Sequence, residues 1–305
     1  MKACILDEEV NEWGTKDTRT ELIHKLHRLE EEQYILREGE SFQDFTDLML
    51  RHMGDPEPEL REHIYSTFYI WLKRDNKLTA EEMRHLLTVL LDDQHLFYRI
   101  GSEGGHSVLT RAFAVLPIAL IMQRDRIHPF LPPKDFQYLK LSLLRYYQEE
   151  KDLRGYLAAE GWAHAAAHGA DALEELIRYE ESDIAVQHEV LEAITGMLHN
   201  GVRIFDEEED ERMASVVETM IREKLLPQQE IAGWIHSLSQ CMEWPDTRAQ
   251  RVARVNGKNI VRSLYFRTIA RNDGNYLTLT SAMLTAEAKL NCFNEANHTY
   301  GGNEA

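Results

Sequence analysis

Apolar residues along this chain recur at the spacing of one face of an α-helix, whereas the alternation typical of strands is scarce. Leu, Glu, Ala and Arg are abundant between short segments that break helices. These breakers lie at 54–58, 101–105, 132–133, 200–201 and 244–246. The stretches between them are long enough for helices and suited to helix hairpins. The pattern therefore predicts an all-α protein.

The predicted helices fall into about five pairs. Their first members span about 41–53, 80–92, 134–147, 183–198 and 228–241, and their second members about 61–73, 107–124, 161–179, 210–224 and 258–271. The second members recur about every 46 to 54 residues, near the period of HEAT and armadillo repeats. We therefore expect an α-α superhelix, an irregular HEAT-like or armadillo-like solenoid, over residues 40–275. A helical extension (1–39) precedes it, and a capping helix with a disordered tail (276–305) follows.

The net charge of the chain limits the classes of molecule that it is expected to bind. Its formal net charge is -18 over 305 residues, which repels the phosphate backbone that nucleic-acid binders must neutralise. Ordinary binding to DNA or RNA is therefore not expected. An acidic surface serves solubility, attracts a basic partner or imitates nucleic acid.

The longest apolar run, 112–122, is much shorter than the roughly 18 to 20 residues that cross a bilayer, and Pro117 interrupts it. No membrane-spanning helix is expected. The first residues turn acidic before the apolar core of a signal peptide forms, which predicts a cytoplasmic protein. Cys4, Cys241 and Cys292 lie far apart, so the sequence indicates neither a disulfide framework nor a thiolate zinc site.

Residues 152–171 contain the most informative pattern. Trp162, His164, His168 and Asp171 fall within one predicted helix, and the spacing of the last three (i, i+4, i+7) aligns them on one face. Two imidazoles and a carboxylate so placed are candidate ligands for a divalent metal. However, Ala165 stands where zincins carry a catalytic Glu. The alternative is a buried hydrogen-bonded network, and the surrounding alanines and glycines allow a helix or a ligand to approach closely.

Further polar residues stand near the start of each second helix, so in a solenoid they would share one groove with this cluster. Those that we expect around the ligand are Arg111, Glu211, Arg212 and Arg262. Arg111 and Arg262 are candidates for binding an anion, or else for salt bridges between repeats. Glu211 is the candidate base. It ends the acidic run 206–211, which also suits the positive end of a helix dipole without any ligand.

Four segments together resemble a known family. They are Asp-Leu-Arg-Gly-Tyr at 152–156, Gly-Trp-Ala-His at 161–164, Ala-His-Gly-Ala-Asp at 167–171 and Glu-Asp-Glu-Arg-Met-Ala at 209–214. They resemble the bacterial domain-of-unknown-function family 2785, over about residues 40–275. Where that family tends to have Arg-Ser-Phe, this chain has Arg-Ala-Phe at 111–113, which argues against a role for a hydroxyl there. The resemblance implies an all-helical fold and brings no activity with it.

Three functional hypotheses follow. The first is an α-solenoid that holds a small molecule or a protein segment in an acidic concave groove centred on the Gly-Trp-Ala-His-Ala-Ala-Ala-His-Gly-Ala-Asp segment. The second is a metal-assisted hydrolase in which His164, His168 and Asp171 bind a divalent metal and Glu211 acts as base. The third is an acidic inhibitor that imitates nucleic acid. No phosphate loop, dinucleotide turn or Ser-His-Asp pattern is visible in the sequence.

Overall fold

The computed structural model describes residues 16–74, 77–271 and 274–293, and these ranges are all-α. Apart from one short hairpin, β1 (Tyr156–Leu157) and β2 (Gly161–Trp162), the regular structure in them is helical. A π-helical stretch (Ile70–Arg74) and a 3-10 stretch (Leu238–Glu243) extend two of the helices. The α-helices are α1 (Lys16–Glu31), α2 (Phe42–Arg51), α3 (Pro58–Tyr69), α4 (Ala80–Leu90), α5 (Ser107–Ile127), α6 (Pro133–Glu149), α7 (Ala165–Leu176), α8 (Ile184–Leu198), α9 (Glu209–Glu223), α10 (Gln228–Ser237), α11 (Arg248–Ala270) and α12 (Leu277–Leu290).

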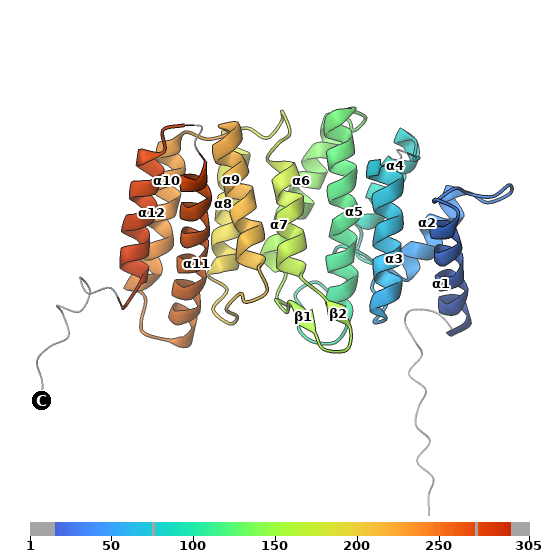
Figure 1. Ribbon diagram of the computed structural model, residues 1–305, viewed down its shortest axis with the longest axis horizontal. Helices are drawn as coiled ribbons and strands as arrows, with labels where there is room; N and C mark the ends of the chain where they lie inside the picture. The colour runs from blue at the N-terminus through green and yellow to red at the C-terminus, as the bar shows by residue number, and fades with distance from the viewer. Residues whose placement is uncertain (1–15, 75–76, 272–273, 294–305) are drawn as a thin grey trace, which may run out of the picture.

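The helices stand side by side in a long row of two layers (Figure 1). One layer holds the odd-numbered helices from α1 to α11, and each of them packs against the next one. The even-numbered helices from α2 to α10 lie behind this layer, and α12 packs against both α10 and α11 at the end of the row. A continuous apolar core lies between the layers.

Local signals explain where many helices begin. The Ser41, Asp183 and Thr247 side chains accept hydrogen bonds at the starts of α2, α8 and α11, and Thr79 and Glu82 form a capping box on α4. Each predicted helix has a counterpart at nearly the predicted position. The last pair differs most, because the Thr247 cap starts α11 ten residues before the predicted 258. The predicted tail from 294 onwards and residues 1–15 lie outside the described residues.

The helix predicted over 161–179 is wrong at its start. Gly161 and Trp162 belong to the hairpin, in which Tyr156 pairs with Trp162 and Leu157 with Gly161. His164 then has left-handed backbone angles (φ 53°, ψ 32°), and α7 begins only at Ala165. Trp162 therefore lies outside the predicted helix and His164 stands at its N-cap, whereas His168 and Asp171 lie within it.

By length and composition alone, α5 is long and apolar enough to cross a membrane. This is weak evidence, since the core helix of a folded domain passes the same test. Most of α5 is buried here, between α3 and α7 in its own layer and against α4.

Candidate functional site

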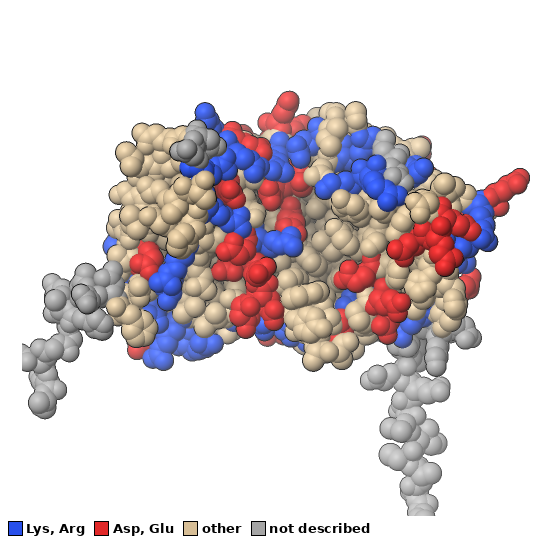
Figure 2. Space-filling model, viewed as in Figure 1, with Lys and Arg blue, Asp and Glu red and all other residues tan. Residues whose placement is uncertain are grey.

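A cavity of about 580 Å³ opens where α3, α5, α7 and α9 meet the hairpin. Figure 2 shows acidic side chains gathered in the middle of this face of the molecule, around a hollow. The lining residues are Glu62, Tyr65, Phe113, Leu116, Trp162, His164, His168, Asp171, Asp206, Glu207, Glu208 and Arg212. The structure therefore brings together five of the eight residues that the sequence predicts for a ligand site: Trp162, His164, His168, Asp171 and Arg212.

The cavity lining is strongly acidic. Five of its side chains are carboxylates and one is a guanidinium, Arg212, which is bound to Asp171. Asp206 has an ion pair with Arg203. Within the described part of the chain, no ion pair is found for Glu62, Glu207 or Glu208. The N-terminal ends of α7 and α9 add only about half a positive charge each, so the carboxylates prevail.

Trp162 provides an aromatic wall. Its ring stacks on that of His164, with centroids 4.3 Å apart and an angle of 24° between the planes, and Tyr156 meets it edge-on from the paired strand. Trp162 is nonetheless 40% exposed. Hydrogen bonds from the His164 and Ala163 amides to the Arg154 and Gly155 carbonyls continue the hairpin pairing up to α7. The hairpin thus holds a large ring at the mouth of the cavity.

Two residues that line the cavity have strained backbones. His164 and Glu208 both adopt positive φ, 53° and 68°, directly before α7 and α9. Outside glycine this conformation costs on the order of 1 kcal/mol or more, and such strain concentrates at functional sites. His164 is held by a hydrogen bond from its Nε2 to the Glu207 carbonyl oxygen, 2.8 Å away.

His168 is a neutral imidazole with one nitrogen free. Its Nδ1 donates to the carbonyl oxygen of Ala112 in α5, at 3.1 Å. Burial, together with the nearby His164, lowers the pKa of His168 to about 3. Its Nε2 has no hydrogen-bond partner among the described residues, so this nitrogen can accept a hydrogen bond in the cavity.

Asp171 is engaged by Arg212. The guanidinium Nη1 donates to both carboxylate oxygens, at 2.9 and 2.8 Å, and so joins α7 to α9. Burial raises the pKa of the Asp171 carboxyl, and Arg212 opposes that rise. This ion pair matches the network interpretation of the motif more closely than the metal hypothesis. In the described ranges, the group of side chains whose ligand atoms are close enough to hold a metal lies elsewhere, on α1 and α3.

Arg111 does not line the cavity, contrary to the sequence prediction. Its side chain is completely buried and forms two hydrogen bonds with Glu150, at 2.6 and 2.7 Å. It also donates to the Tyr98 carbonyl oxygen at 2.9 Å and to the Ser107 hydroxyl at 3.2 Å. These contacts tie α5 to the segments before it and after α6. Arg111 therefore stabilises the fold and cannot reach an anion in the groove.

Glu211 and Arg262 lie in a neighbouring hollow on α9 and α11, and not in the shared cavity that the sequence predicts. Arg262 is bound to Glu287 of α12 at 2.6 Å. Burial would raise the pKa of Glu211, but hydrogen bonds from Arg267 and Ser263 outweigh it, and the pKa is lowered. A carboxylate held in this way is a weak base, which disfavours the catalytic role predicted for Glu211.

The small residues of the motif serve helix packing. The Tyr146 hydroxyl of α6 donates to the Ala165 carbonyl oxygen at 3.2 Å. The buried Tyr147 ring lies directly against Gly169, where a Cβ atom would stand 2.7 Å from its Cδ2. Gly169 therefore lets α7 and α6 approach closely.

We expect Gly169→Ala to destabilise the protein by about 1 to 3 kcal/mol, because the added methyl group overpacks the buried Tyr147 ring. Gly233 in α10 is the matched control, since no atom lies within 4 Å of a Cβ there. Gly233→Ala should stabilise by about 0.5 to 1 kcal/mol through helix propensity. Chemical denaturation measures both changes. Equal effects of the two substitutions would contradict the packing role of Gly169.

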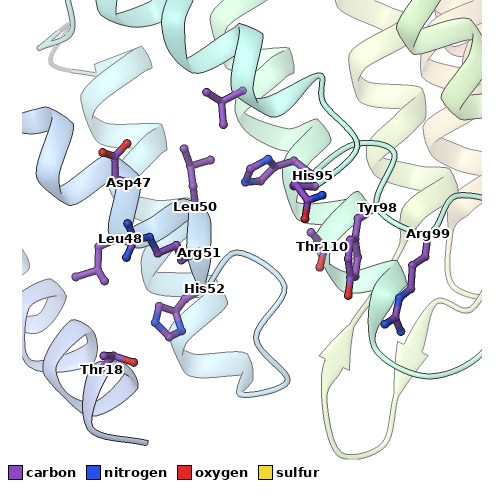
Figure 3. Close-up of a pocket in the computed structure, with 12 residues that line it drawn as sticks. Thr18, Asp47, Leu48, Leu50, Arg51, His52, His95, Tyr98, Arg99 and Thr110 are labelled. Carbon is purple, nitrogen blue, oxygen red and sulfur yellow. The ribbon is translucent and has the colours of Figure 1, made fainter. Parts of the chain in front are cut away.

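A larger hollow, about 820 Å³, lies nearer the N-terminus. Figure 3 shows that Asp47 and Arg51 of α2, with His52 directly after it, border this hollow on one side, and His95 and Thr110 on the other. Both histidines interact with nearby aspartates, His52 with Asp55 at 3.5 Å and His95 with Asp92 at 2.8 Å. Acidic and basic groups are mixed in this hollow, so it shows less charge preference than the cavity around Trp162.

The lining residues that are absent from the predicted site are Glu62, Tyr65, Phe113, Leu116, Asp206, Glu207 and Glu208. Glu62 and Tyr65 lie one turn apart on α3, and this i, i+3 spacing is a signal that the sequence offers for a shared face. The acidic run 206–211 is visible in the sequence, where a helix dipole and a solvated loop account for it without a ligand. In the structure, the residues of this run have different environments. Asp206, Glu207 and Glu208 line the cavity, whereas Glu209 is buried.

Comparison with known proteins gives one family. The model of the protein family of unknown function DUF2785 matches residues 96–266, a narrower range than the expected 40–275. No curated protein and no solved structure matches the chain. The matched range contains α5 to α9 with the hairpin, and hence most of the cavity lining. Since the match covers more than half of the sequence, the chain belongs to the DUF2785 family.

Proposed function

We propose that this protein is an α-solenoid that binds an organic cation, either a small molecule or a basic side chain of a protein segment, in the cavity around Trp162. One observation carries the proposal. Three carboxylates without an ion pair in the described ranges, on Glu62, Glu207 and Glu208, surround a space of about 580 Å³ that is walled by aromatic rings.

The arrangement of the helices supports the solenoid. Successive odd-numbered helices pack against one another in one layer, as inner helices of stacked pairs do. The cavity uses four consecutive members of that layer, α3, α5, α7 and α9. Binding surfaces of helical repeat proteins are commonly formed in this way.

The chemistry of the lining supports a cation. An ammonium or guanidinium group is attracted both to carboxylates and to the face of an aromatic ring. Trp162 is partly exposed for such a contact, and Tyr65 lines the same space. The free His168 Nε2 adds one acceptor for an N–H donor. The overall charge of -18 favours the approach of a cation.

The test uses spermidine, arginine and a Lys/Arg-rich peptide as probes in calorimetry, with citrate as an anionic comparison. We expect the cations to bind and citrate not to bind. Trp162→Ala should weaken cation binding by about 2- to 30-fold, the range of a cation–π contact. Trp244→Ala is the matched control, because Trp244 is also 40% exposed and also contacts a histidine, His199. It should leave the affinity unchanged.

Two further results are decisive. Glu207→Gln should lower the affinity and its dependence on salt, since it removes one of the carboxylates that attract the cation. Equal affinities for wild type, Trp162→Ala and Glu207→Gln would place any binding outside the cavity and refute the proposal. Binding of the peptide but neither small cation would identify the ligand as a protein segment.

The other two hypotheses gain less support. A metal-assisted hydrolase would need the Asp171 carboxylate as a metal ligand, but Arg212 already binds this carboxylate. It would also need Glu211 as a base, and this carboxylate is bound by Arg267. For imitation of nucleic acid, the net charge is the supporting feature.

A further inference from the structure

His27 of α1 and His63 of α3 meet at the surface where these two helices pack together. Their Nε2 atoms are 3.1 Å apart. The ring centroids are 4.6 Å apart, farther than these nitrogens, so the rings turn their Nε2 atoms toward each other. Without an ion, one ring must carry its proton on Nε2 and donate it to the other.

A carboxylate completes the group. Glu59 Oε1 lies 3.3 Å from His27 Nε2 and 4.0 Å from His63 Nε2. Glu59 and His63 are four residues apart on α3, so one helical face presents both. The result is a set of two imidazole nitrogens and one carboxylate oxygen facing a common point.

The separations suit a zinc ion. Atoms 3.1, 3.3 and 4.0 Å apart lie on a circle with a radius of about 2 Å, which is the usual Zn–N and Zn–O bond length. Two ligands of a tetrahedral ion at that bond length stand about 3.3 Å apart. Little movement is therefore needed to form three bonds, and the three side chains are partly exposed to solvent.

A second carboxylate lies behind the group. Glu30 Oε2 is 3.6 Å from His63 Nδ1. Metal-bound histidines commonly donate their other nitrogen to a carboxylate, which fixes the ring and makes it a better ligand. With a metal on Nε2, the Nδ1 proton of His63 would face Glu30.

We infer that His27, Glu59 and His63 form a binding site for a divalent transition metal ion, zinc above all, which joins α1 to α3. Imidazole and carboxylate donors suit zinc and, under the general affinity order, copper and nickel as well. The site lies outside the region that the family model matches, and it is separate from the cavity around Trp162.

The test is zinc binding by the full chain after removal of any affinity tag. Calorimetry and elemental analysis after dialysis against zinc sulfate should give one equivalent for the wild type. Loss of an outer partner alone costs about 10- to 100-fold in affinity, so His27→Ala and His63→Ala should each cost about 100-fold or more. Zinc should raise the melting temperature of the wild type and not that of these variants.

His24→Ala is the matched control, because His24 is an exposed histidine of the same helix. It should bind zinc as the wild type does. Circular dichroism checks that all variants keep their helical content. If wild type, His27→Ala and His63→Ala bind zinc equally, or if the wild type binds none, the inference is wrong. Loss of zinc in His168→Ala but not in His63→Ala would instead locate the metal in the cavity.

Discussion

Arg111→Ala should lower the free energy of unfolding by about 3 to 5 kcal/mol, the usual effect of removing one partner of a buried ion pair. Arg111 and Glu150 side chains are 0% and 1% exposed, so the substitution leaves a carboxylate buried without its cation. The Tyr98 carbonyl oxygen and the Ser107 hydroxyl lose a donor as well. Urea denaturation of the two proteins measures the difference. Arg111→Leu combined with Glu150→Leu should cost less than the single change, because no charge is then left unpaired.

Arg251 provides the comparison for this prediction. It makes the same type of two-bond contact with Asp246, at 2.9 and 3.1 Å, but both side chains are exposed. Arg251→Ala should therefore lower the free energy of unfolding far less than Arg111→Ala, because solvent screens an exposed ion pair. If Arg111→Ala were as mild as Arg251→Ala, the structural role of Arg111 would be refuted and its use in ligand binding would again be open.

Acid should destabilise the protein through His168. The pKa of this histidine is about 3 when folded, mainly because of burial, against about 6.5 in the unfolded chain. Between pH 6.5 and about 3, the histidine is therefore protonated in the unfolded state but remains neutral in the folded state. The contribution of this group is fully present above pH 6.5, falls as the pH drops and is lost near pH 3. We expect a total loss of about 2 to 4 kcal/mol, reduced by water in the cavity.

His168→Asn isolates this effect. An asparagine amide can donate to the Ala112 carbonyl oxygen in place of Nδ1, but it does not titrate. Stability measured by urea denaturation between pH 7 and pH 4 should fall more steeply for the wild type than for this variant. Parallel curves for the two proteins would show that His168 is protonated as easily in the folded state as in the unfolded one.

The helices were largely predictable because their signals are local. Breakers such as 54–58 and caps such as Ser41 and Thr79 act within a few residues. The hairpin was not predictable in this way. Its strands have two residues each. It is held in place by Arg61 of α3, whose guanidinium donates a hydrogen bond to the carbonyl oxygen of Glu160 in the hairpin loop. No repeating pattern in the sequence indicates contacts of this kind.

For the site, residue type was a better guide than spacing. Trp162, His164, His168 and Asp171 do face one cavity, although only His168 and Asp171 lie within α7, with His164 at its N-cap and Trp162 in the hairpin. Arg111 was misjudged because its partner, Glu150, is 39 residues away and only tertiary packing brings the two together. The His27–His63 contact was missed for the same reason, because the two residues are 36 positions apart in the sequence.

The row of helices also bears on how the chain is assembled during synthesis. The most extensive helix contacts join helices that are next to each other or one helix apart in chain order, so each helix finds its partners soon after they are made. The N-terminal helices can thus pack while later ones are still being made, because domains fold in order as they emerge from the ribosome. The cavity, by contrast, needs residues from Glu62 to Arg212. A nascent chain therefore acquires its binding site only after α9 has joined the row.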